Sequence, residues 1–99
     1  MAMPSSSYID LTLGASGSTY TAPADGYIYV ELQMPSGAGL WIHIYDTNNN
    51  YLYGYSTTVA TTSGTTIPPT PILKGFIYNV YYTNGTKTRF RFIYAEGSK

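Results

Sequence analysis

The chain contains no cysteine, and His43 is its single histidine. Without a thiol it forms no disulfide, no cysteine-ligated zinc site and no catalytic thiolate. A catalytic nucleophile needs a general base and a third group that orients this base. His43 stands in mid-strand between Ile42 and Ile44, where a packed or interfacial histidine is the common case. Because spacing also pairs none of the five acidic residues, we expect no enzyme, no catalytic residue and no cofactor.

Charge is scarce as well. Only 10% of the residues are Asp, Glu, Lys or Arg, against about 25% in an average domain. Five acidic and five basic residues cancel, which argues against nucleic acid and against a polybasic membrane contact. No apolar run approaches the ~18 residues of a membrane helix, so we expect no membrane insertion.

No stretch shows helical periodicity, whereas tyrosine, with 12 copies, and threonine are abundant and suit a pleated surface. Gly, Pro and Asn interrupt the chain at short intervals, as in an antiparallel β-sandwich or barrel of about eight short strands. We expect a flexible N-terminal segment or cloning scar over residues 1–7 and a single β-sandwich domain over residues 8–97. The expected strands are residues 8–13, 18–21, 27–34, 40–46, 51–57, 62–67, 76–83 and 88–95.

Two connections carry specific turn chemistry. Asn84-Gly85 lies between two alternating runs and predicts a β-hairpin. Asn84 also opens a formal glycosylation acceptor, which the turn chemistry explains without a sugar. The run IPPTP, residues 67–71, removes three backbone donors and therefore belongs to an edge strand or a loop.

Most expected strands have one apolar side and a second side that is aromatic with polar tips. Trp41, His43 and Tyr45 share such a second side, and an exposed patch of this kind is rare on monomers. Tyr and Trp suit interfaces because they combine a large apolar body with a hydrogen-bonding tip. The alternative is that the tyrosines are simply good strand formers that lie flat on a polar surface.

The loop DTNNN imitates the first half of a calcium loop, with Asp46, Asn48 and Asn50 at alternate positions. The full pattern requires Gly at its sixth position and Glu at its twelfth. This chain has Tyr51 and Thr57 there, so we predict a polar hairpin loop and no metal site.

Tyr51, Tyr53 and Tyr55 alternate along the strand that follows this loop and are therefore expected on one side of it, beside the asparagines. Aromatic rings stack on the apolar face of a pyranose while amides bind its hydroxyl groups. The alternative is an edge of the core that is filled by tyrosines. The predicted ligand-binding residues are Asn49, Tyr51, Tyr53 and Tyr55.

Three segments, YTAPADGYIYVEL, PILKGFIYNVYYTNG and RFRFIYAEGSK, resemble the C-terminal tip domains of bacteriophage tail and head fibres. Those domains have a jelly-roll sandwich like that of the C1q and tumour-necrosis-factor modules. The resemblance covers most of the chain from Thr19 onward. LKG before Phe76 is similar to the Leu-x-Gly-Asp that opens a late strand in C1q-like modules, with Phe76 in place of the Asp.

The resemblance implies a homotrimer in which one sheet of each subunit faces the threefold axis. It also implies a virion protein that binds a bacterial surface polysaccharide or protein. Two alternatives remain: a monomeric carbohydrate-binding module of a secreted bacterial protein with a Trp41 and Tyr45 platform, and a structural fibre segment without a ligand. The interface residues expected on this basis are Trp41, His43, Tyr45, Ile77, Tyr81 and Ile93.

Overall fold

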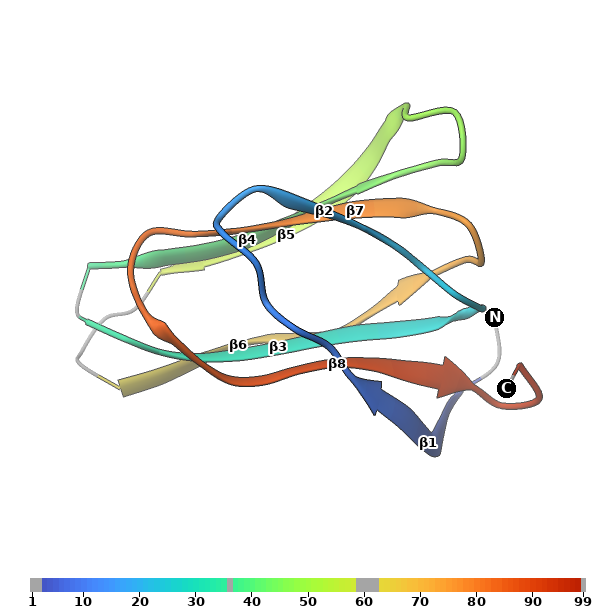
Figure 1. Ribbon diagram of the computed structural model, residues 1–99, viewed down its shortest axis with the longest axis horizontal. Coiled ribbons are helices and arrows are strands. Elements are labelled where there is room, and N and C mark those ends of the chain that lie inside the picture. The colour runs from blue at the N-terminus through green and yellow to red at the C-terminus, as the bar shows by residue number, and fades with distance from the viewer. Residues whose placement is uncertain (1–2, 36, 59–62, 99) are drawn as a thin grey trace.

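In the computed structural model, residues 3–35, 37–58 and 63–98 are described, and they form two packed layers of β-strands (Figure 1). The expected all-β sandwich of eight strands is confirmed. The described residues include no helix that is long and apolar enough to cross a membrane. The strands are β1 (Pro4–Asp10), β2 (Ser18–Thr21), β3 (Gly26–Met34), β4 (Gly39–Tyr45), β5 (Tyr51–Thr58), β6 (Ser63–Ile72), β7 (Ile77–Tyr82) and β8 (Thr86–Ala95).

Each layer is a four-stranded antiparallel sheet. Sheet A has the strand order β1-β8-β3-β6, and sheet B has the order β2-β7-β4-β5. Successive strands alternate between the sheets except at β4 and β5, which form a hairpin within sheet B. This order is that of an eight-stranded jelly roll. Both termini lie at the end of the sandwich that also carries the β4–β5 loop (Figure 1).

The prediction of a β-hairpin at Asn84-Gly85 is wrong. β7 pairs with β2 and β4 in sheet B, whereas β8 pairs with β1 and β3 in sheet A, so this connection crosses between the sheets. At its start the Thr83 amide donates a hydrogen bond to the Gly39 carbonyl, with N···O 3.0 Å. A local turn signal reports a reversal of the chain but not the sheet that receives the next strand.

β1 and β6 are the two edge strands of sheet A. β6 lies at the edge of sheet A, as the prolines predict, and the register shifts where Pro68 and Pro69 oppose the stretch from Ile28 to Val30. β1 begins at Pro4, four residues before the expected strand start, and the end of β8 at Ala95 pairs with it there.

The core lies between the sheets and is entirely apolar among the described residues, apart from the hydroxyl of Tyr78. In β3 the alternate residues Ile28, Val30, Leu32 and Met34 are buried, as a period of two requires. The two described ion pairs lie outside this core. Interiors are packed as densely as organic crystals, so this core holds the two outer faces in fixed positions.

Candidate functional site

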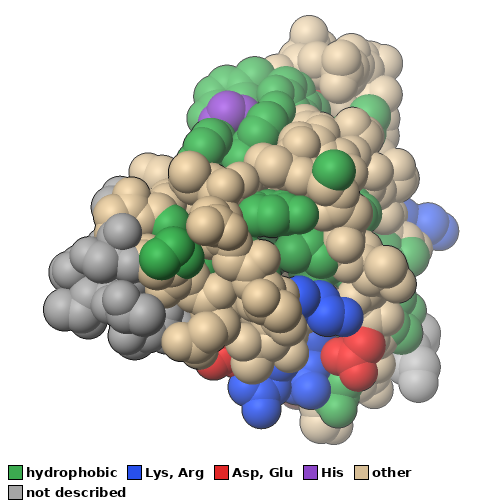
Figure 2. Space-filling view, turned by 60° about the vertical axis from the view of Figure 1, so that its left-hand side comes forward, with side chains coloured by type: hydrophobic (Ala, Val, Ile, Leu, Met, Phe, Trp, Pro, Cys, Tyr) green, Lys and Arg blue, Asp and Glu red, His purple; other side chains and the backbone are tan. Residues whose placement is uncertain are grey.

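Aromatic side chains gather on the outer face of sheet B. In β4 they alternate with the buried Ile42 and Ile44 and therefore point away from the core. Figure 2 shows the single histidine among hydrophobic side chains, apart from the main group of charged ones. We call this surface the aromatic face; its residues are Trp41, His43, Tyr45, Tyr51 and Tyr81.

The rings of the aromatic face contact one another in sequence. The Trp41 and Tyr81 rings stack with centroids 5.5 Å apart and planes 7° apart. His43 lies 5.1 Å from the Tyr81 ring and 5.4 Å from the Tyr51 ring. Tyr45 meets Tyr51 edge to face at 5.7 Å. These spacings fall in the favourable range for aromatic pairs, so the rings hold one another in place without a ligand.

A β-bulge brings Tyr51 onto this face. Ile44 pairs with Tyr53 and Tyr45 pairs with Tyr51, so Leu52 is the extra residue in β5. An extra residue turns the side chains before it to the other side of the strand. The prediction that Tyr51 and Tyr53 share a side is therefore wrong.

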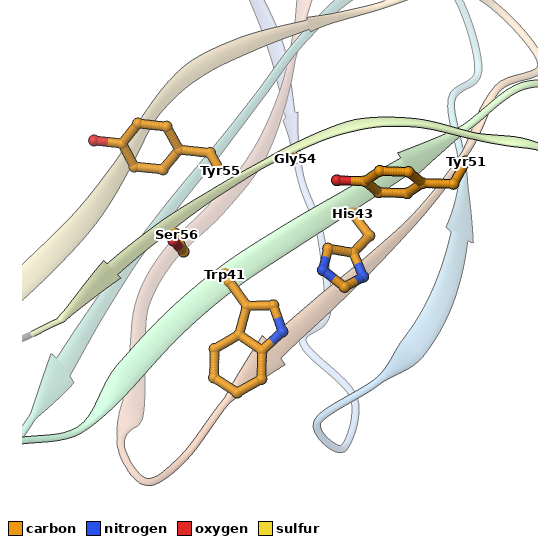
Figure 3. A pocket seen from close by; sticks show the side chains of 6 residues that line it. All are labelled: Trp41, His43, Tyr51, Gly54, Tyr55 and Ser56. Atoms are coloured by element: carbon orange, nitrogen blue, oxygen red, sulfur yellow. The ribbon is translucent and has the colours of Figure 1, made fainter.

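The other two predicted tyrosines have different surroundings. Tyr53 opposes the buried Ile44, and its hydroxyl donates a hydrogen bond to the Pro71 carbonyl of β6, which links the two sheets. Partial burial raises the pKa of the Tyr53 hydroxyl. Tyr53 thus fits the alternative of a tyrosine at the edge of the core. Tyr55 is 43% exposed and points away from Trp41 and His43 (Figure 3).

A shallow hollow of about 200 Å³ lies at the β5 side of the aromatic face. Gly54 keeps it open, because a Cβ there would lie 2.4 Å from the Ile42 carbonyl oxygen and 3.1 Å from the Tyr51 hydroxyl. Ring faces, an imidazole and a serine hydroxyl therefore border one open space (Figure 3). The lining residues are Trp41, His43, Tyr51, Gly54, Tyr55 and Ser56.

The remaining predicted ligand residue, Asn49, belongs to the β4–β5 turn. Its φ of 66° is left-handed, a conformation that asparagine tolerates well. Asp46 caps the turn: its Oδ1 accepts hydrogen bonds from the backbone N–H groups of Asn48 at 2.8 Å and Asn50 at 2.9 Å. The Asp46 carboxylate therefore accepts hydrogen bonds from the backbone of its own loop, as in a polar turn. The described residues contain no cluster of three His, Asp or Glu side chains that could hold a metal.

This cap predicts a pH dependence. Hydrogen bonds from the Asn50 backbone, the Asn50 side chain and the Asn48 backbone lower the pKa of Asp46 below its ordinary 3.8. A lowered pKa means that the ionised carboxylate stabilises the folded state above pH 3.8 and that this contribution is lost as the pH falls through the folded pKa. We expect Asp46→Asn to have a lower melting temperature than the parent at pH 7. The difference should disappear in melts at progressively lower pH, and one that persists at the lowest pH would contradict the ionic role.

The expected interface residues divide between the two sheets. Ile77 pairs with Tyr45 and lies beside the aromatic face, together with Trp41, His43 and Tyr81. Ile93 does not: it pairs with Tyr8 and Tyr27 on the outer face of sheet A. The prediction that all six residues share one face is therefore wrong, because the chain crosses from β7 in sheet B to β8 in sheet A at the Asn84-Gly85 connection.

The outer face of sheet A contains the second hollow, of about 390 Å³, which the sequence did not reveal. Its residues come from β1, β3, β6 and β8 and meet only in the folded sheet. The available signal was the alternation of Arg89 and Arg91 with the buried Phe90 and Phe92. Together the two hollows and the aromatic face offer surfaces for binding. No protein-family model, curated protein or solved structure matches this chain.

Proposed function

We propose that the chain is a trimeric recognition domain of a bacteriophage fibre tip that binds a glycan or another receptor on the bacterial surface. The aromatic face carries this proposal. Its residues present apolar rings with polar tips, and His43 is the only one among them with an ionisable nitrogen. The phage assignment is supported by the resemblance of the three segments to bacteriophage fibre tip domains. On this assignment the protein is part of the virion.

The chemistry of the aromatic face suits contact between subunits. Interface cores are depleted of charge and enriched in Trp and Tyr, and a few such residues supply most of the binding energy. The polar neighbour Asn79 is already satisfied, because its side-chain amide donates to the Thr19 hydroxyl at 2.9 Å and to the Gly17 carbonyl at 3.2 Å. A cyclic trimer closes such head-to-tail contacts on themselves.

The sequence from residue 47 to residue 73 supports recognition of a neutral ligand. It contains no Asp, Glu, Lys or Arg, and both β5 and β6 lie within it. The described side chains of these two strands can therefore bind a ligand only through stacking, apolar contact and hydrogen bonds. Neutral sugars match this chemistry, since they offer hydroxyl groups and apolar ring faces.

The test is the absolute mass in solution, measured by light scattering behind a sizing column. We expect about three times the 10.9 kDa chain mass. Tryptophan fluorescence gives an independent readout, because Trp41 is the only tryptophan and should become less accessible to iodide in the trimer. A monomer at every concentration would overturn the trimer.

The hollow beside Trp41 favours a second candidate function: a monomeric carbohydrate-binding module of a secreted bacterial protein. The site would then be the space between Trp41, Tyr51 and Ser56. For a monomer we expect Tyr51→Ala to abolish retardation on polysaccharide gels. Leu73→Ala should have little effect, since the Leu73 side chain is exposed but does not line this hollow. Equal effects of the two variants would contradict this site, and a trimer without any glycan binding would indicate a structural fibre segment.

A further inference from the structure

The hollow on sheet A is chemically different from the aromatic face. Its walls are mostly apolar and come from Tyr8, Tyr29, Pro69 and Ile93, with Arg91 as the charged group. A mostly apolar hollow with few polar groups is the usual form of a small-molecule site. It lies on the opposite sheet from Trp41, so both surfaces could be occupied at once.

The Arg91 guanidinium is held on two sides. Its Nε donates to Asp10 Oδ1 at 2.9 Å, and its Cζ lies 4.2 Å above the Tyr8 ring. Asp10 and Arg91 are direct partners in the β1–β8 register, which fixes the pair at one place on the sheet. The two terminal nitrogens make no hydrogen bond to another described residue. They are therefore a positioned pair of donors.

The neighbouring arginine shows the contrast. Arg89 donates through Nη1 to Glu31 Oε1 at 2.6 Å, so a carboxylate of the chain already occupies one of its two terminal nitrogens. The Arg89 side chain is also 50% exposed, whereas that of Arg91 is 29% exposed. A partly desolvated guanidinium with an open terminal edge is suited to bidentate binding of a carboxylate.

Side-chain hydroxyl groups border the same hollow as the Arg91 guanidinium. Tyr29 is the cross-strand partner of Arg91 on β3, and Ser6 and Tyr8 border the same hollow from β1. The side-chain hydroxyls of these three residues make no hydrogen bond to another described residue. The hollow therefore combines tyrosine rings, open hydroxyls and one fixed cation.

We propose that this hollow binds a uronate residue of a bacterial surface polysaccharide. The sugar carboxylate accepts two hydrogen bonds from the terminal nitrogens of Arg91, and the pyranose lies against Tyr8 or Tyr29. Asp10 balances the charge of Arg91 through Nε, so recognition depends on the geometry of the guanidinium rather than on net positive charge. The inference rests on the proposed recognition function and gives it a second, acidic ligand.

The test is an NMR titration of the full chain with methyl glucuronide, with methyl glucoside as the neutral match. We expect the Arg91 Nε–Hε signal and the Ile93 amide to shift with the glucuronide only. Arg91→Lys keeps the charge but loses the planar pair of donors, so it should bind about tenfold more weakly. Arg89→Lys is the matched control on the same strand and should bind as the parent does. Thermal melts of both variants establish that they are folded.

Three outcomes would overturn the uronate site. They are equal shifts with the glucoside, equal loss of binding in the two lysine variants, and tighter binding of glucose 6-phosphate than of the glucuronide. The last outcome would assign the hollow on sheet A to a phosphate ligand. A trimer that binds host cells or neutral glycans but not glucuronide removes this inference and leaves the proposed function intact. A monomer that binds glucuronide through Arg91 supports this inference and removes the proposed trimer.

Discussion

Replacing Phe90 by alanine should lower the free energy of unfolding by about 3–5 kcal/mol. Phe90 is 1% exposed in the central strand β8, and its ring meets the Tyr20 ring at 5.0 Å with an angle of 79°. The substitution leaves a cavity between two sheets that are held in place by several strands, so the site cannot collapse to fill it. Small domains have a total stability of about 5–15 kcal/mol. Urea denaturation followed by circular dichroism measures the loss.

The control for Phe90→Ala is Arg89→Gln, one residue earlier in β8. Arg89 points outward, and its exposed ion pair with Glu31 is worth at most about 1 kcal/mol. We expect the Arg89 variant to unfold close to the parent. If both variants lost the same stability, the alternation of β8 between core and surface would be wrong.

The strands could be predicted because burial with a period of two is a local property of the sequence. The alternation in β3, from Ile28 to Met34, is visible without any partner strand. The sheet that a strand joins is not local. Phe90 and Phe92 need a core, but β1 and β3 provide the backbone partners of β8, and β1 lies about 80 residues earlier in the chain. The Asn84-Gly85 signal contains no information about that choice.

The same limit explains which part of the candidate site could be predicted. Trp41, His43 and Tyr45 lie on one strand, so their shared face follows from their spacing. Tyr51 joins them because of the bulge at Leu52, and no residue type around it signals a bulge. The hollow around Arg91 depends on the register of β1 against β8, which only the folded sheet determines.

The two outer faces can serve separate purposes. The aromatic face has rings that shield one another, and burial between subunits would remove its remaining apolar area from water. The face of sheet A keeps two ion pairs, Arg89–Glu31 and Arg91–Asp10, whose desolvation in an interface would be costly. In the proposed trimer this difference favours a subunit contact through sheet B, which leaves sheet A accessible to ligands.

Replacing Trp41 by glutamate should therefore convert the proposed trimer to monomers. Loss of a central tryptophan contact typically costs about 2 kcal/mol or more, which weakens each contact by about 30-fold. An unpaired carboxylate buried in the interface adds to this cost. Light scattering over a dilution series measures the shift. Tyr55→Glu is the control, because the same charge there lies on an exposed side chain that points away from the aromatic face.

Ile93→Glu decides between the two sheets. It places the same carboxylate on the outer face of sheet A, where Ile93 pairs with Tyr8 and Tyr27. If Trp41→Glu dissociates the trimer and Ile93→Glu does not, the subunits meet through the aromatic face and the hollow on sheet A stays open. If only Ile93→Glu dissociates it, sheet A faces the threefold axis. The hollow on sheet A would then be closed between subunits, and the aromatic face would be the surface left for a ligand.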